Sequence, residues 1–182
     1  EQRAAFKGWI EAGGGFVALH GAGGDPNYKW RWYVDNLIGA QFTGHTLSPQ
    51  FQQGRLVIED QTHPATKGLG AEWVREEEWY SFDKSPRAKG YHVLVTLDEA
   101  SYSPREKIPF LVDKDLRMGK DHPVVWTHCE GKGRAFYSAL GHQAESYAES
   151  KHLAMIAGAI SWAAGLEGPG CGAGKEVGAF VR

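Results

Sequence analysis

One glycine-rich segment constrains the fold of this chain more than any other. Residues 13–24 read GGGFVALHGAGG, so that three glycines precede a short apolar run and a second glycine-rich turn follows it. The first glycines are typical of a helix end, and the run 16–19 is apolar on both faces, as in a strand covered by helices on each side. Because ligands of open α/β sheets bind beyond the carboxyl ends of strands, His20 is the first candidate functional residue. The alternative is a structural histidine, hydrogen-bonded within a tight turn.

The size and charge of the chain limit its class and its partners. Its 182 residues suit one domain, placed at 1–166, followed by a glycine-rich tail at 167–182. A formal net charge of −2 offers no positive field for nucleic acid. No stretch approaches the roughly 18 consecutive apolar residues of a membrane span. We therefore expect a soluble protein without nucleic-acid or membrane partners, whose 7 tryptophans allow an apolar interface in a homo-oligomer.

Two cysteines and the start of the chain give less guidance. Cys129 ends an apolar strand and Cys171 lies in the tail, with no partner at metal-ligand spacing. We infer no disulfide and expect Cys129 to be a free buried thiol. The chain starts at Glu1 inside a helical pattern, so we expect its N-terminal segment to be missing, and cytoplasmic and periplasmic locations both stay open.

Helical spacing alternates with short apolar runs along the chain. Apolar side chains recur at helical spacing over 1–12 and 151–164, and an aromatic segment, 30–39, is a further expected helix that ends at Gly39. In the strand 72–82, Glu76, Glu78, Tyr80 and Phe82 are expected on one face. A polar stretch of about 25 residues before 124–129 is long enough to cover a site. The expected strands are 16–19, 51–59, 72–82, 91–97, 124–129 and 134–140.

Seven phrases in a fixed order carry a family resemblance. They read GGGFVALHGAGG, LIGAQFTGH, HPATKGL, EEWYSF, VLVTLDEASY, DHPVVWTH and GRAFYSALGHQAESY. On these phrases the chain resembles the ThuA-like family, named for trehalose utilisation, from residue 1 to about 165. The resemblance implies the fold of class I glutamine amidotransferases, an α/β, flavodoxin-like, mostly parallel sheet flanked by helices. It also implies that this chain lacks the first strand, first helix and second strand of such a member.

The resemblance also assigns places to two histidines. In the amidotransferase pattern a cysteine nucleophile occupies the turn after a central strand, and a later strand delivers the histidine that activates it. Here His20 stands in the cysteine's place, His142 resembles the later histidine, and Glu145 falls one residue beyond the usual carboxylate. Neither Cys129 nor Cys171 is placed to replace the nucleophile, so glutaminase activity is not expected.

Two histidines at one sheet edge permit two chemistries. As neutral imidazoles, His20 and His142 bind a divalent metal, zinc or manganese, while His45, Glu78 or Glu145 completes a site that keeps one position open for water. Alternatively, the histidines transfer protons directly, and Glu78 orients one of them. A site without catalysis is the third alternative.

Aromatic side chains near these segments point to a carbohydrate ligand, because flat apolar faces with polar tips suit a sugar ring. Core packing is the default for any one of them, Trp79 above all. The resemblance implies disaccharide catabolism with 3-keto-sugars as intermediates. We expect a hydrolase, lyase or isomerase acting on a glycoside or 3-keto-sugar, against the alternative of a non-catalytic sugar-binding or assembly module. The candidate substrate-binding residues are Gly21, Asp25, Trp30, Trp32, His45, Trp79, Tyr80 and Tyr147.

The remaining histidines are expected to have structural roles. His63 and His122 each precede proline, which favours a turn. His128 lies within an apolar strand and is expected in the core, whereas His92 and His152 are expected at the surface.

Overall fold

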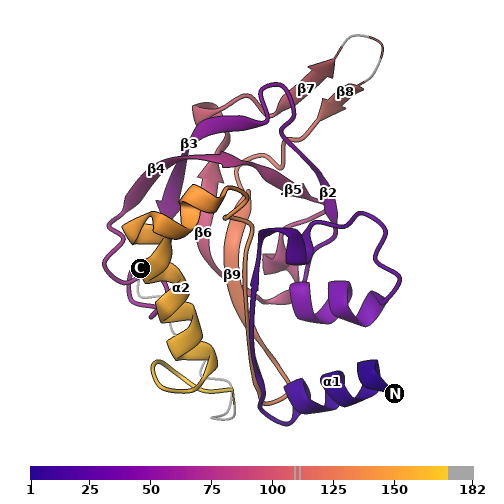
Figure 1. Ribbon diagram of the computed structural model, residues 1–182, viewed down its shortest axis with the longest axis vertical. Helices are drawn as coiled ribbons and strands as arrows, with labels where there is room; N and C mark the ends of the chain where they lie inside the picture. The colour runs from indigo at the N-terminus through magenta and orange to yellow at the C-terminus, as the bar shows by residue number, and fades with distance from the viewer. Residues whose placement is uncertain (109, 111, 172–182) are drawn as a thin grey trace.

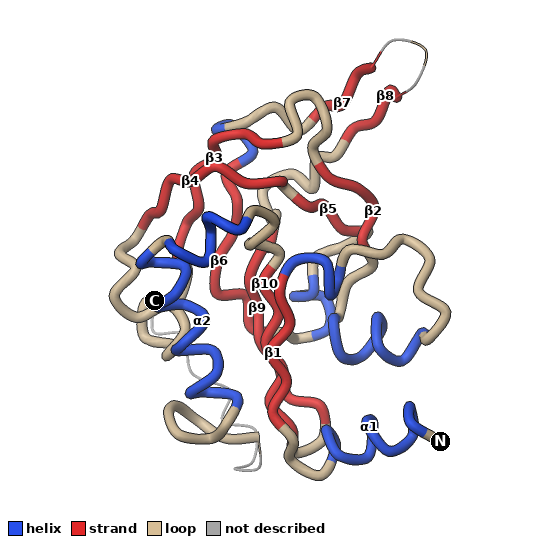
Figure 2. Tube along the Cα trace, in the orientation of Figure 1, coloured by secondary structure: helices blue, strands red, loops and turns tan. Residues whose placement is uncertain are grey.

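A computed structural model describes residues 1–108, 110 and 112–171 of the chain (Figure 1). One six-stranded sheet has the order β1-β10-β9-β6-β3-β4, and β2–β5 and β7–β8 form two small sheets (Figure 2). The strands are β1 (Gly15–Leu19), β2 (Phe42–His45), β3 (Phe51–Ile58), β4 (Glu72–Glu78), β5 (Tyr80–Phe82), β6 (His92–Asp98), β7 (Arg105–Ile108), β8 (Val112–Asp115), β9 (Pro123–Glu130) and β10 (Gly133–Ser138). The helices are α1 (Gln2–Glu11) and α2 (Ser150–Ala163), with the short helices η1 (His20–Gly23), η2 (Tyr33–Ile38), η3 (Pro86–Lys89), η4 (Glu99–Ser101) and η5 (Ala144–Ala148).

The large sheet is mixed and mostly antiparallel, so the expected mostly parallel, flavodoxin-like sheet is not found. Strands β1 and β10 pair in parallel, while every other described pairing of this sheet is antiparallel. The connections explain the difference, because parallel neighbours need a crossover of about a dozen residues or more. Strand β9 ends at Glu130 and β10 begins at Gly133, which leaves room for a hairpin turn alone.

Helices cover the sheet on both sides of β1. Figure 1 shows α2 on one side of β1 and α1 with η2 on the other. Strand β9 is buried from Pro123 to His128, and the side chains of Trp126, Phe136 and Tyr137 are at most 1% exposed between the layers. Among the described residues, none of the helices has the length and apolar character needed to cross a bilayer.

The aromatic segment 30–39 forms a shorter helix than expected. Its six-residue π-helix, η2, ends at Ile38 and is capped by Gly39, which has a positive φ of 98°. A Cβ atom at Gly39 would lie 2.2 Å from the Tyr91 ring, so glycine is required there both for conformation and for space. The expected helix end at Gly39 is therefore confirmed.

The expected strand 72–82 is broken at Trp79. Its ring is buried and donates from Nε1 to the carbonyl of Gln52 at 2.8 Å, while the chain leaves β3 and pairs with β2. The break comes after Glu78, and β4 pairs with β3 in regular register up to that residue, which agrees with one shared face for Glu76 and Glu78. The two residues differ in burial, since Glu76 is exposed whereas Glu78 is buried.

The two cysteines form a disulfide, contrary to expectation. Cys129 and Cys171 are bonded across a sequence separation of 42 residues, and Cys129 is exposed. The described part of the tail returns to the end of β9, where Cys171 meets Cys129. The spacing of the two cysteines in the sequence does not indicate this contact. The bond fastens the end of the described tail to the sheet.

The remaining histidines agree with expectation except His152 and His122, the latter of which is buried in an extended segment before β9 and not in a turn. His152 is fully buried, not at the surface, and its ring donates to the carbonyl of Ser146. Because α2 lies against β1 and β10, this histidine faces the core of the protein. The others lie as follows: His92 is exposed beside Asp60, His128 donates to Leu37 from the core, His122 bridges Glu99 and Tyr80, and His63 accepts from Ala65 within its turn.

His63 is expected to make the stability of the protein depend on pH. Burial, with help from His92, lowers the pKa of His63 from 6.5 to about 4. Between these values the unfolded chain binds a proton that the native state does not, so stability falls as pH drops from 6.5 towards 4. We expect His63→Asn, which keeps an acceptor for Ala65, to reduce this loss by about 1–2 kcal/mol in urea unfolding at pH 7 and pH 4.5. Equal losses in both proteins would contradict the assignment.

Candidate functional site

Parallel pairing of β1 and β10 brings two segments to one edge of the sheet. Leu19 pairs with Ser138, so His20 and the turn 139–142 leave the sheet together. His20 has a positive φ of 42°, which is uncommon for a residue other than glycine and is typical of functional sites. The Tyr137 hydroxyl donates to the His20 carbonyl at 3.0 Å and holds this turn. A Cβ at Gly23 would lie 2.5 Å from the Tyr137 ring, so glycine is needed there as well.

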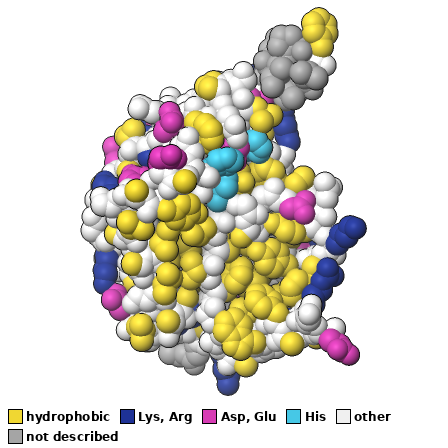
Figure 3. Space-filling view, viewed as in Figure 1, with side chains coloured by type: hydrophobic (Ala, Val, Ile, Leu, Met, Phe, Trp, Pro, Cys, Tyr) yellow, Lys and Arg dark blue, Asp and Glu magenta, His cyan; other side chains and the backbone are white. Residues whose placement is uncertain are grey.

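His20, His142 and Glu78 meet at this edge. His20 Nε2 lies 3.0 Å from His142 Nδ1 and 3.2 Å from Glu78 Oε2, and the latter two atoms are 3.0 Å apart. His20 and Glu78 are buried, whereas 38% of the His142 side chain is exposed. Histidine side chains accordingly gather in the upper half of the face in Figure 3 (cyan). The group is therefore buried on one side and open to solvent on the other.

The hydrogen bond at the far side of the His20 ring sets its tautomer. Nδ1 donates to the Ala139 carbonyl at 2.9 Å, so Nε2 of a neutral His20 carries a lone pair. Glu78 Oε2 is a carboxylate oxygen, and His142 Nδ1 can bring one proton. When both histidines are neutral and Glu78 is ionised, the three potential ligand atoms together carry at most one proton. Such a cluster is suited to a cation, because a metal ion can replace the shared proton.

The two oxygens of Glu78 face different partners. While Oε2 faces His20 and His142, Oε1 accepts from Gln50 Nε2 at 2.5 Å and lies 3.0 Å from His45 Nδ1. Burial acts to raise the pKa of Glu78, but the contact with the His20 ring, the hydrogen bond from Gln50 and the neighbouring rings of His45 and His142 outweigh it and lower the pKa to about 2. Glu78 is therefore a carboxylate at neutral pH.

The donor set fits a divalent transition metal. The ligand atoms of His20, Glu78 and His142 all lie within 4.8 Å of one another. Tetrahedral zinc, with bonds of about 2.0–2.1 Å, places its ligand atoms about 3.3 Å apart, close to the distances in this group. A carbonyl that orients the distal nitrogen of a ligating histidine is typical of such sites. Two histidines and a carboxylate leave a further position for water or substrate.

Several predicted substrate-binding residues lie at or beside this group. Gly21 is exposed next to His20, and His45, 28% exposed in its side chain, contacts Glu78. Tyr80 packs under His20 with ring centroids 4.2 Å apart, and burial together with Glu78 raises the pKa of its hydroxyl. Tyr147 donates to the Gly141 carbonyl at 3.1 Å, beside His142. Tyr80 is thus a support beneath the site rather than an exposed surface.

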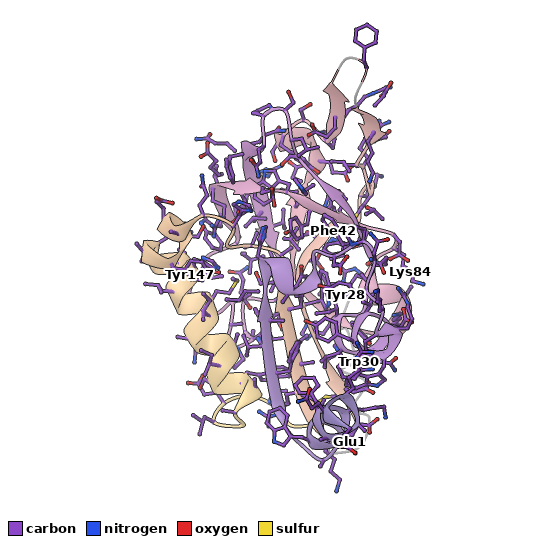
Figure 4. All side chains as sticks on the ribbon, turned by 45° about the vertical axis from the view of Figure 1, so that its right-hand side comes forward. Glu1, Tyr28, Trp30, Phe42, Lys84 and Tyr147 are labelled. Atoms are coloured by element: carbon purple, nitrogen blue, oxygen red, sulfur yellow. A yellow bond between two sulfur atoms is a disulfide. The ribbon has the colours of Figure 1, made fainter. Side chains whose placement is uncertain are left out.

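Other predicted residues lie apart from this group. Trp79 belongs to the core, in agreement with the default for aromatic residues. Trp30 packs against Phe6 of α1 and against Trp32, and Figure 4 shows Trp30 towards the end of the molecule that carries Glu1. The remaining two are exposed: Asp25 accepts from the Asn27 amide, and Glu145 lies in η5 without a hydrogen bond to either site histidine in the described part of the chain.

Two features of the site escaped the sequence reasoning. Gln50 holds the carboxylate of Glu78, and the Ala139 carbonyl orients His20. A glutamine in a loop between strands carries no sequence signal of such a contact. The position of the Ala139 carbonyl near His20 could have been predicted, because Ala139 directly follows β10, the strand that precedes His142.

Comparison with known proteins gives a consistent family assignment. The model of the ThuA family, described as trehalose utilisation, matches residues 1–163. A ThuA-like protein from Bacteroides uniformis ATCC 8492 has 31% sequence identity and a TM-score of 0.69 over 88% of this chain and 62% of that chain. One from Parabacteroides merdae ATCC 43184 has 18% identity and a TM-score of 0.63 over 90% of this chain and 65% of that chain.

A more distant likeness concerns the fold alone. The β-galactosidase from Rahnella sp. R3 has 16% identity and a TM-score of 0.50 over 89% of this chain and 20% of that chain. The chain thus spans less than two thirds of the length of these solved structures. No curated protein sequence matches it.

Proposed function

The chain belongs to the ThuA family, described as trehalose utilisation, and from this membership we propose that it is an enzyme of carbohydrate catabolism with a metal-assisted site at His20, Glu78 and His142. The observation that carries the proposal is the convergence of three ligand atoms that share at most one proton. A purely structural histidine pair does not need a buried carboxylate at the same point. Zinc and manganese are the proposed ions, and a glycoside or 3-keto-sugar is the proposed substrate.

The residues around the three ligands suit polar chemistry on a sugar. A divalent ion at this site would act as a Lewis acid towards a carbonyl or hydroxyl oxygen. His45 Nδ1 faces Glu78 and the Thr46 carbonyl, so Nε2 of this partly exposed ring is available to accept a proton from a substrate. We propose His45 as the proton-transfer group and Glu78 as the carboxylate that orients it. Tyr147 and Gly21 form the proposed rim for sugar hydroxyls.

Glutaminase chemistry is not part of the proposal. Thioester formation needs a thiolate at the strand-to-helix turn, where this chain has His20. Cys129 and Cys171 are joined in a disulfide near the start of β10, whereas His20 follows the end of the parallel strand β1. A cysteine nucleophile is therefore absent from the site.

Metal binding by the purified protein tests the proposal first. We expect about one Zn²⁺ or Mn²⁺ per chain in calorimetric titration, and at least about 100-fold weaker binding by His142→Ala, because a ligand is lost. His92→Ala, which removes an exposed histidine, is the matched control and should bind like the parent protein. No binding of either ion by the parent protein would overturn the metal-assisted site.

Turnover assays then separate an enzyme from a binding module. Glycosides and 3-keto-sugars are incubated with the metal-loaded protein and with His142→Ala. An enzyme loses turnover on this substitution while it keeps much of its sugar affinity. Sugar binding without turnover in the parent protein would favour the non-catalytic module.

A further inference from the structure

The carboxylate next to Glu78 in the chain has an unusual set of partners. Glu77 is fully buried in β4, and its Oε1 accepts from the backbone N–H groups of Glu78 at 3.1 Å and His142 at 3.2 Å. Its Oε2 accepts from the backbone N–H of Gly141 at 2.8 Å and from Arg75 Nη2 at 2.9 Å. One oxygen therefore holds the main chain of two residues of the candidate metal site.

This arrangement differs from an ordinary buried ion pair. Arg75 would satisfy the charge of Glu77 by itself, and buried pairs of this kind contribute little net stability. The additional backbone contacts reach a turn that comes from β10, a strand far from β4 in the sheet order. Gly141 in this turn has a positive φ of 111°, and the Tyr147 hydroxyl would lie 2.8 Å from a Cβ placed there. The turn is thus held by Glu77 from one direction and confined by Tyr147 from another.

We propose that Glu77 is a positioning residue, which fixes the backbone of Gly141 and His142 so that His142 Nδ1 faces Glu78 Oε2. This inference rests on the proposed function of the site. Glu77 acts on the main chain of His142 while Glu78 contacts its ring, so two successive carboxylates of β4 determine where the imidazole lies. Arg75 holds Glu77 in turn and is itself anchored by Ser146 Oγ at 2.7 Å.

Zn²⁺ titration of Glu77→Gln tests the positioning role. We expect the affinity for Zn²⁺ to fall about 10–100-fold, the range found when a residue that orients a metal ligand is lost. Glu76→Gln, an exposed neighbour in the same strand, should change it less than about twofold, as expected for a surface residue away from such a feature. Because Glu77→Gln leaves Arg75 without its buried carboxylate, the double variant Arg75→Met/Glu77→Gln removes this charge imbalance. We expect the double variant to recover thermal stability but not Zn²⁺ affinity.

Nitrogen-15 NMR of the His142 ring gives a second readout in metal-free protein. We expect Glu77→Gln to shift the His142 Nδ1 signal and Glu76→Gln to leave it unchanged, because the hydrogen bond to Glu78 depends on the ring position. Unchanged affinity and unchanged His142 signals in folded Glu77→Gln would overturn the proposal, as would full recovery of affinity in the double variant. If the parent protein binds no Zn²⁺, the metal function fails and the His142 signal alone decides the positioning role.

Discussion

Glu78→Gln is expected to lower Zn²⁺ affinity at least about 100-fold, more than the loss of an orienting residue. The substitution keeps the size of the side chain but removes the only anion among the three proposed ligands. An amide oxygen is a weaker ligand for zinc than a carboxylate, and the two histidines alone leave the ion underligated. Titration calorimetry on the purified variant, loaded from metal-free protein, measures the change.

Two controls make the Glu78→Gln result specific. Glu76→Gln changes the same charge two residues earlier in β4, at an exposed position, and should bind Zn²⁺ like the parent protein. Circular dichroism of both variants checks that the fold is retained. Zn²⁺ affinity within threefold of the parent value in folded Glu78→Gln would mean that the ion, if bound, has other ligands.

Cys171→Ser is expected to lower the free energy of unfolding by about 2–4 kcal/mol. The disulfide closes a loop between residues that are 42 positions apart, and the loop-entropy estimate for this length is about 4 kcal/mol. The lower end of the range applies if the tail opens before the sheet unfolds. Urea unfolding of the parent protein and of Cys171→Ser under oxidising conditions gives the difference.

Reduction provides the control for the disulfide. Parent protein treated with a thiol reductant should unfold like Cys171→Ser, whereas the variant should not respond to the reductant. A parent protein whose urea midpoint is the same with and without reductant would contradict a stabilising disulfide. The proposed metal site lies at the other end of β1 and β10, so Zn²⁺ affinity should be the same in both proteins.

Local patterns predicted much of the framework. The helix before Gly13, the strand at 16–19, the helix end at Gly39 and the final helix before Gly165 are all found, because glycine positions and helical spacing act over a few residues. The family resemblance also placed His20 and His142 at the ends of two strands, and parallel pairing of these strands brings the two rings together.

Other parts of the site depend on contacts between distant segments, which a local sequence pattern does not predict. Alternation in the strand predicted the face of Glu78, but the contact of its carboxylate with His20 depends on where the end of β1 lies in the fold. Gln50 and Glu77 contact the site from segments whose composition is unremarkable in sequence. The tryptophans at 30 and 32 pack by α1, a placement that the sequence alone did not predict.

The sequence by itself determined where α1, α2 and most strands of the large sheet lie, which family the chain belongs to, and which two histidines follow the strands β1 and β10. Only the tertiary structure decided the mostly antiparallel order of the sheet, the disulfide between Cys129 and Cys171, and the meeting of Glu78 with both histidines. The physical reason is the range of the interactions. Turn conformation and side-chain periodicity are set by neighbouring residues, whereas strand order and the closing of a carboxylate on two imidazoles depend on contacts between segments 58 to 122 residues apart.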